Sequence, residues 1–309
     1  MMDSKIKNIQ DELALEYHGL PVDAGRMNSY EVAAYIKAFS DFLGVVSRDA
    51  YGERIELQTK IQGFSKGSFK IDFAFYIGFV AATIFDQASP MSIKDFLGLI
   101  KDSLGLWRFL AGEPPKAISP DPSNQNSFSI ENQNGQSIYV SAHVINIVGN
   151  EMAGEAVEKF IKSALENNLS HVGLSSKSMG EITKIEKNEA SYFVPVITRE
   201  PRPIQNEQEM QMVLLIESPT FKEGNKWRFS DGENSFPAAI VDEEFLKKIN
   251  ERLERFGKGD ELIAKVRFTQ SGKFGALKLD RTVIKVIEHR IPPPLSQTGS
   301  LFKFDPIKK

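Results

Sequence analysis

Histidine is the residue type in this chain best suited to acid–base or metal chemistry, and the chain has four histidines: His18, His143, His171 and His289. They lie far apart, and none has the histidine partner four residues away that the metal-binding HExxH pattern requires. We therefore expect each to be a structural or surface residue. The carboxylates fall mostly on predicted helix faces and turns, so the sequence nominates no catalytic residue, no metal ligand and no cofactor-binding residue.

An aromatic and basic set in the C-terminal third is the main candidate for binding. Aromatic and basic side chains together favour a nucleic-acid platform. The i, i+2 spacing of Trp227 and Phe229 instead favours two core rings with Arg228 outside, and we prefer this second interpretation. Between Met210 and Arg290 there are 15 basic and 13 acidic residues, so the segment is only mildly basic. The candidate ligand surface consists of Arg228, Lys265, Arg267, Lys278 and Arg281.

A seven-residue motif occurs twice in succession, as KDFLGLI from Lys94 and KDSLGLW from Lys101. A seven-residue step nearly repeats the azimuth of a helix, so Gly98 and Gly105 lie on one face, where they permit close approach of another backbone. This pattern predicts that the chain forms a homo-oligomer. The predicted self-association surface comprises Phe96, Gly98, Leu104, Gly105 and Trp107.

Segment 73–112 as a whole is predicted to be a long helical hairpin, and three roles stay open for it. The three roles are a buried part of the core, a self-association surface and a membrane-active hairpin. Its longest uncharged apolar run, Phe73 to Phe85, has 13 residues, whereas a helix that spans a membrane needs about 20. The run therefore favours burial in protein over a membrane span.

The elements before and after this hairpin alternate between strand and helix patterns. Strands are expected at Leu13–Leu20, Ile55–Ile61 and Phe69–Phe75, with a helix from Asn28 to about Arg48. Segment 113–135 is rich in Pro, Ser, Asn and Gln and predicts an exposed loop. It ends in a hairpin turn at Asn134-Gly135. A further helix is expected over Glu151–Leu169, followed by short strands over Val172–Ile185.

Beyond a polar linker at 198–209, the pattern is that of a small β-barrel. Three strands are expected between Met210 and Val241, followed by a helix capped by Asp242 and two strands ending near Glu288. This is the element order of an OB-fold. The fold class is thus α+β. An α/β-sandwich-like domain (1–197) precedes an OB-like barrel domain with one helix (210–290) and a tail (291–309).

Composition points to a soluble protein of the cytoplasm. Hydrophobic residues make up 41% of the chain and charged residues 26%, and the net charge is −3. These values are ordinary for a globular protein and give no global reason for a nucleic-acid partner. Cysteine is absent, which excludes disulfides, thiolate metal sites and a cysteine nucleophile. The first thirty residues lack the apolar region of a signal peptide.

Several short motifs together resemble a family of uncharacterised bacterial proteins often encountered in prophages and other mobile elements. The motifs are Val22 to Met27, Gly67-Ser68-Phe69, the Leu-Gly-Leu repeats, Tyr192-Phe193, Trp227-Arg228-Phe229, Asp242 with Phe245, and Gly257 to Asp260. The resemblance covers most of the chain and implies no activity. It implies a role in phage–host conflict only through genomic setting.

The sequence therefore predicts a non-enzymatic binding or assembly protein. It is expected to self-associate through segment 73–112 and to bind a ligand, a peptide or nucleic acid through the barrel. Two alternatives from other classes stay open: a phage-defence effector with a membrane-active hairpin, and an enzyme of unrecognised type.

Overall fold

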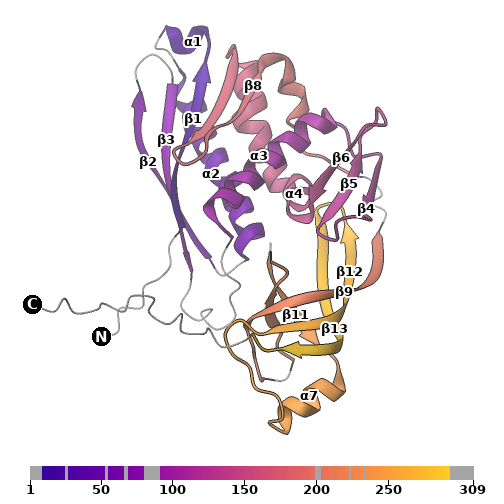
Figure 1. Ribbon diagram of the computed structural model, residues 1–309. Helices are drawn as coiled ribbons and strands as arrows, with labels where there is room; N and C mark the ends of the chain where they lie inside the picture. Colours follow the sequence, from indigo (N-terminus) through magenta and orange to yellow (C-terminus); the bar gives the residue numbers. More distant parts are fainter. Residues whose placement is uncertain are drawn as a thin grey trace, which may run out of the picture. The chain divides into compact units, whose positions relative to one another are not determined.

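The computed structural model describes residues 9–24, 27–52, 55–65, 69–79, 91–198, 203–222, 224–232 and 234–292 (Figure 1). The chain divides into two compact units. The first unit is Met1–Glu207 with Thr269–Leu279, and the second is Gln208–Phe268 with Asp280–Lys309. Helices and strands are both abundant, and five strands close into a barrel, so the predicted α+β fold with a small barrel is confirmed.

A five-stranded sheet in the order β2-β3-β1-β7-β8 forms the frame of the first unit. Its neighbouring strands are all antiparallel. The strands are β1 (Ile9–His18), β2 (Ile55–Ser65), β3 (Phe69–Phe79), β7 (His171–Ser176) and β8 (Gly180–Glu186). The central strand β1 is the first in the sequence, and its partner β7 comes more than 150 residues later.

Helices cover one face of this sheet, as Figure 1 shows. They are α1 (Leu20–Asp23), α2 (Ser29–Tyr51), α3 (Ile93–Leu110), α4 (Ala142–Val148), α5 (Glu151–Val157), the π-helical η2 (Glu158–Lys162), α6 (Ser163–Glu166) and the 3-10 helix η3 (Lys187–Tyr192). Side-chain oxygens of Asn28, Ser92, Ser141 and Asn150 accept N–H bonds at four of the helix starts. These caps satisfy donors that have no partner within the helix.

The core of the first unit lies between the sheet and these helices. Because side chains alternate along a strand, Leu13, Leu15 and Tyr17 of β1 all point to the helical face, where they are fully buried. Phe73 of β3 meets Phe39 of α2 with ring centroids 4.9 Å apart. The opposite face of β1 carries the polar residues Glu12, Glu16 and His18, and within the described residues the helices cover one side of the sheet (Figure 1).

A second, three-stranded sheet consists of β4 (Ala117–Pro120), β5 (Ser127–Glu131) and β6 (Ser137–Ser141). The turn predicted at Asn134-Gly135 lies between the paired strands β5 and β6, and Gly135 has a φ of 77°. This conformation favours glycine because a Cβ would clash with the backbone. Strand β4, which lies inside the segment expected to be an exposed loop, is a difference from the prediction.

The predicted helical hairpin over 73–112 is wrong over Phe73–Phe79. Residues up to Phe79 belong to β3, which pairs with both β1 and β2, and only Ile93–Leu110 forms a helix. A short run that is apolar at nearly every position does not distinguish a strand from a helix, because it shows neither the alternation of a half-buried strand nor the period of an amphipathic helix. Residues 80–90, the rest of the expected hairpin, lie outside the described residues. None of the described helices is long and apolar enough to cross a membrane.

The second unit is built on the closed barrel β10-β11-β13-β12-β9. Its strands are β9 (Ile204–Ser218), β10 (Trp227–Ser230), β11 (Ser235–Ile240), β12 (Glu261–Lys273) and β13 (Ala276–Arg290). Helix α7 (Glu243–Asn250) joins the third strand to the fourth. Strands β11 and β13 run parallel, and β10 is antiparallel to both β9 and β11. Together with the element order, this is the five-stranded Greek-key arrangement of an OB-fold.

The boundary region differs from the expected linker at 198–209. Residues from Ile204 onward belong to β9, and the first unit ends at Glu207. The first unit also includes Thr269–Leu279, the tip of the β12–β13 hairpin, whose side chains Phe274 and Leu277 are part of its core. The expected tail begins with Ile291 and Pro292, and residues 293–309 lie outside the described residues.

Candidate functional site

Three aromatic residues gather at one end of the barrel, and we call Phe221, Trp227 and Phe256 the aromatic end. Phe221 is 68% exposed, whereas Trp227 beneath it is only 3% exposed. The ring centroids lie 5.8 Å apart for Phe221–Trp227, 6.3 Å for Phe221–Phe256 and 4.9 Å for Trp227–Phe256. These separations are those of packed aromatic pairs. Phe221 is therefore an exposed ring held from below by two others.

The elements that hold these rings follow from the barrel topology. Trp227 and Phe229 of β10 both point into the barrel core, as their spacing predicts. Phe221 lies in the β9–β10 loop, where Asn225 N–H donates to the Lys222 carbonyl oxygen at 3.2 Å. Phe256 lies in the α7–β12 loop. The two loops meet because the end of β9 pairs with the start of β12, with Ile216 N–H bonded to the Asp260 carbonyl oxygen at 2.9 Å.

His289 holds the α7–β12 loop in place. Its Nδ1 lies 2.8 Å from Glu254 Oε2, and its Nε2 lies 3.2 Å from Asp260 Oδ2. The two ring nitrogens thus link a residue of the α7–β12 loop to the residue that precedes β12. The His289 ring also packs on Phe256 at 5.0 Å. The histidine is thus a structural clamp, as the sequence predicts for isolated histidines.

The basic residues of the predicted ligand surface do not form one patch. Lys265 Nζ and Arg267 Nη2 both bond to Glu209, at 2.6 and 2.8 Å, and hold the pKa of this carboxyl below its ordinary value. Lys278 is exposed but belongs to the hairpin tip in the first unit. Arg281 stacks over the buried Phe236 ring at 4.2 Å, and burial lowers its pKa. Neighbouring groups of the protein therefore engage most of these charges.

Arg228 is the exception among the predicted ligand residues. It lies on the outer side of β10 between Trp227 and Phe229, and only 8% of it is exposed. Its Nε donates to Glu217 Oε2 at 2.9 Å, and the Ser235 hydroxyl donates to the same oxygen. Its Nη2 is buried and has no hydrogen-bond partner among the described residues. The sequence places Arg228 outside the core but gives no sign of this carboxylate.

Further cations surround the aromatic end without a carboxylate partner in the described part of the barrel. They are Lys222, next to Phe221, and Arg255 and Lys258, on either side of Phe256; all three are exposed. The sequence analysis missed Phe221 and Phe256 as site residues. Their only signal is an adjacent basic residue, which does not distinguish an exposed ring from a core ring.

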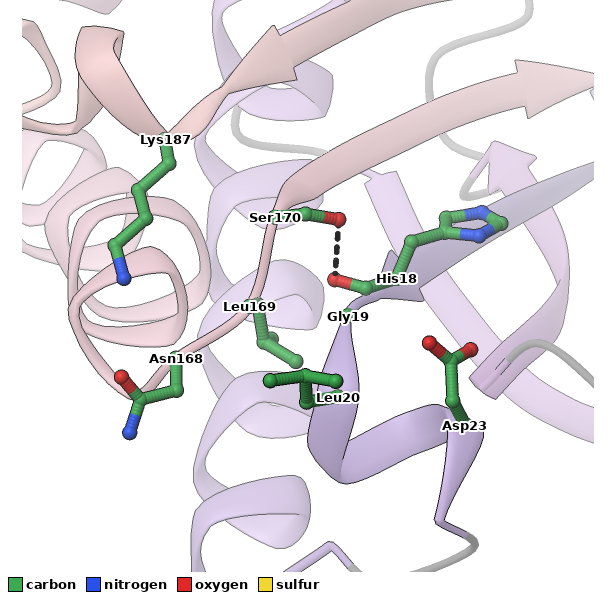
Figure 2. A pocket seen from close by; sticks show the side chains of 8 residues that line it. All are labelled: His18, Gly19, Leu20, Asp23, Asn168, Leu169, Ser170 and Lys187. Carbon is green, nitrogen blue, oxygen red and sulfur yellow. Dashed lines mark hydrogen bonds between the residues drawn. The ribbon is translucent and has the colours of Figure 1, made fainter.

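The first unit has an open pocket of about 500 Å³ where β1 ends and β7 begins. In Figure 2, Lys187 and Asn168 lie on one side of Leu20, and His18 and Asp23 lie on the other. The polar groups are thus spread around an apolar centre and do not converge on one point. Within the described residues, no group of three or more His, Asp or Glu side chains could hold a metal ion.

Two histidines stack beside this pocket. The rings of His18 and His171 are 4.2 Å apart and 11° from parallel. The Ser170 hydroxyl donates to the His18 carbonyl oxygen at 3.0 Å (Figure 2), so it accepts from His171 Nδ1, 3.2 Å away. A serine whose proton is already engaged and whose histidine neighbour is a donor is not an activated nucleophile. The arrangement is structural.

One sequence pattern with catalytic associations lies at the β2–β3 hairpin. Residues 63–67 read Gly-Phe-Ser-Lys-Gly, which matches the G-x-S-x-G pattern of serine hydrolases. That pattern requires a turn from a strand into a helix, whereas Gly63 and Ser65 pair with Asp72 and Lys70 of the returning strand. The structural context of a nucleophile elbow is therefore lacking.

The predicted self-association surface on α3 must be corrected. Phe96, Leu104 and Trp107 are fully buried in the core of the first unit, and Trp107 Nε1 donates to the Val194 carbonyl oxygen at 3.0 Å. Side chains that fill the core do not form an outer surface. Gly98 and Gly105 lie on the other side of the helix, where a Cβ would meet nothing within 4 Å. Self-association through these two glycines stays a prediction.

Comparisons with known proteins add no family to this picture. No family model matches the chain, and neither the curated proteins nor the solved structures contain a match. The resemblance to bacterial proteins of mobile elements, and the role in phage defence that it implies, stay predictions. The proposed function therefore depends on the contacts and the exposure of the barrel residues.

Proposed function

We propose that this protein is a non-enzymatic binding protein of the cytoplasm whose barrel binds single-stranded nucleic acid at the aromatic end. The observation that carries the proposal is the exposed Phe221 ring, held by Trp227 and Phe256. A base stacks on an aromatic ring through its flat face, and each such contact contributes about 1–3 kcal/mol. The ring is exposed to solvent and packs against two other rings, which suits such stacking.

The position of Phe221 on the barrel supports this function. It lies in the loop between the first and second barrel strands, β9 and β10. In OB-folds, this loop and the face of the second and third strands bind oligonucleotides. One fold serves many functions, so the topology supports this function by analogy. The exposed Phe221 ring supports the proposal independently of that analogy.

The charges around the ring also support a polyanionic ligand. Lys222, Arg255 and Lys258 are exposed and without carboxylate partners in the described part of the barrel. Such cations attract the phosphate backbone, and the resulting affinity falls as the salt concentration rises. Because the chain as a whole carries a net charge of −3, this attraction is local to the barrel end.

Fluorescence anisotropy with labelled DNA and RNA strands of about 15 nucleotides tests the proposal, since one OB-fold contacts about 4–16 nucleotides. The wild-type protein is expected to bind single strands more tightly than duplexes. Replacing Phe221 by Ala is expected to weaken binding about tenfold or more, which corresponds to one lost stacking contact.

Tyr139→Ala is the matched control, because Tyr139 is also an exposed ring, 63% exposed, but lies on β6 of the first unit. It is expected to leave binding unchanged. The proposal fails if the wild type binds no single strand, or if Phe221→Ala and Tyr139→Ala have equal effects.

A further inference from the structure

We infer that Arg228 forms an anion-binding subsite on the outer face of the barrel, and that this subsite takes a phosphodiester group of the bound strand. This inference rests on the proposed function and specifies which chemical group of the ligand the second strand of the barrel recognises.

Only one of the five N–H groups of this guanidinium has a partner among the described residues. Nε donates to Glu217 Oε2, and Nη2 is buried without a hydrogen-bond partner. Since buried polar groups are nearly always paired in native proteins, an unpaired one marks a missing partner. The edge formed by Nη1 and Nη2 matches the two oxygens of a phosphate, which it binds through two parallel hydrogen bonds.

Arg267, on β12, shows what a satisfied guanidinium looks like in the same barrel. Its Nε and its Nη2 both donate to Glu209 Oε1, at 3.1 and 2.8 Å. Glu209 also bonds to Lys265, so one carboxylate engages both cations. Glu217 instead engages Arg228 through Nε alone, so Nη2 stays without a hydrogen-bond partner among the described residues.

The neighbours of Arg228 favour a phosphodiester over an isolated carboxylate. Arg228 directly follows Trp227, which supports the exposed Phe221 ring. Its register partner on β9 is Ser218, three residues before Phe221. A stacking ring and an anion site therefore lie at the same end of β10, and a nucleotide carries both a flat base and a phosphate. The nearby Lys222 adds positive charge, as a chain of phosphates requires.

The orientation of Arg228 is built into the barrel. Trp227 and Phe229 are both in the core, so strand alternation places Arg228 on the outer face. The Ser235 hydroxyl of β11 and Arg228 Nε share one oxygen of Glu217. Three strands thus hold one guanidinium, and less conformational freedom is lost when it binds a ligand.

Two strands of identical sequence provide the test: one with ordinary phosphodiesters and one with uncharged methylphosphonate linkages throughout. Anisotropy titrations at about 0.1 M salt compare wild type, Arg228→Gln, Arg228→Lys and the control Arg267→Gln. The wild type is expected to bind the phosphodiester strand at least tenfold more tightly. Arg228→Gln is expected to lose about tenfold on that strand and nothing on the methylphosphonate strand. For this variant, the slope of the logarithm of the binding constant against the logarithm of the salt concentration should be smaller in magnitude by about 0.7. This is the value for one phosphate contact on a single strand.

Arg228→Lys keeps the charge but not the planar edge, so an intermediate affinity is expected, whereas Arg267→Gln should bind like wild type. Circular dichroism of each variant checks that the barrel folds, and the comparison of the two strands on the wild type needs no variant. Equal wild-type affinity for both strands, or Arg228→Gln equal to wild type, overturns the inference. If Phe221→Ala still weakens binding in that case, the proposed function stands. If the wild type binds neither strand, the proposed function itself fails.

Discussion

Asn146 holds both main-chain polar groups of Leu277. Its Nδ2 donates to the Leu277 carbonyl oxygen at 3.0 Å, and its Oδ1 accepts from the Leu277 N–H at 2.7 Å. One side chain of α4 thus engages both main-chain groups of this residue of β13. Leu277 itself is buried in the core of the first unit. The two hydrogen bonds therefore fix the β12–β13 hairpin tip within that unit.

Replacing Asn146 by Ala is expected to lower the free energy of unfolding of the first unit by about 2 kcal/mol. The reason is that a donor and an acceptor on a buried segment lose their partners, at about 1–3 kcal/mol for each unsatisfied group. Urea denaturation measures the change. Asn188→Ala, at an exposed position of η3, is the control and should change the free energy by less than about 0.5 kcal/mol. An equal effect of both variants would contradict the role given to Asn146.

Two glycines are expected to respond to alanine in opposite ways. A Cβ on Gly149 would lie 2.5 Å from the Cα and N of Gly275, a main-chain contact that no side-chain rotation relieves. Gly149→Ala should therefore destabilise the first unit. Gly98 lies in α3 with open space around its Cβ position. Gly98→Ala should stabilise by about 0.5–1 kcal/mol, since alanine favours the helix.

Thermal denaturation of both glycine variants checks this prediction. A loss of stability for Gly98→Ala would mean that another backbone approaches α3 at this point, as the self-association hypothesis requires. Sedimentation of wild type and Gly98→Leu would then show whether that backbone belongs to a second copy of the chain.

The fold was predictable wherever local patterns decide it. Alternating residues identify β1 and β2, and Asn28 and Asp242 identify two helix starts through their capping side chains. The order of the barrel elements led to the OB topology. The segment from Tyr76 to Phe79 was misassigned because a continuous apolar run without alternation does not distinguish a strand from a helix.

The candidate site was less predictable, because its parts come from separate loops. Arg228 was predicted to lie outside the core by its position between Trp227 and Phe229, but its ion pair with Glu217 depends on the β9–β10 register. Phe221 and Phe256 are 35 positions apart, and no local pattern indicates that their rings meet. Contacts between loops depend on the whole barrel, which explains why the sequence alone did not reveal the aromatic end.

Acid is expected to weaken the first unit through His171. Burial lowers the pKa of this histidine below its ordinary value of 6.5, and the neighbouring His18 and Lys184 lower it further, against the opposing charges of Glu186 and Glu16. The unfolded chain then binds more protons than the folded chain, so the free energy of unfolding falls as the pH falls below 6.5 through the folded-state pKa. Above pH 6.5, the contribution of neutral His171 to the free energy of unfolding is fully present.

Urea denaturation of wild type and His171→Gln between about pH 7.5 and pH 5 measures this contribution. The variant should lose less stability on acidification than the wild type does. Identical pH dependence of the two proteins would show that the fold does not favour the neutral form of this imidazole.

Replacing His289 by Leu is expected to lower the stability of the second unit. His289→Leu would remove a hydrogen-bond partner of the Asp260 carboxylate, which is only 3% exposed. Leaving a buried polar group without its partner costs about 1–3 kcal/mol, and more when the group is charged. A second change, Asp260→Asn, should restore part of the loss by removing that charge. Thermal denaturation of the single and double variants tests the prediction, and a double variant less stable than His289→Leu would contradict it.

The most direct test of the binding account is an NMR titration that follows the Arg228 Nε–H and Trp227 Nε1–H signals while a single-stranded oligonucleotide is added. Assignment comes from the signals that disappear in Arg228→Gln and Trp227→Phe. The account predicts that both signals shift with the same saturation curve, while the Trp107 Nε1–H signal from the core of the first unit stays in place. Binding that leaves the Arg228 and Trp227 signals unmoved would contradict the placement of the ligand on the barrel.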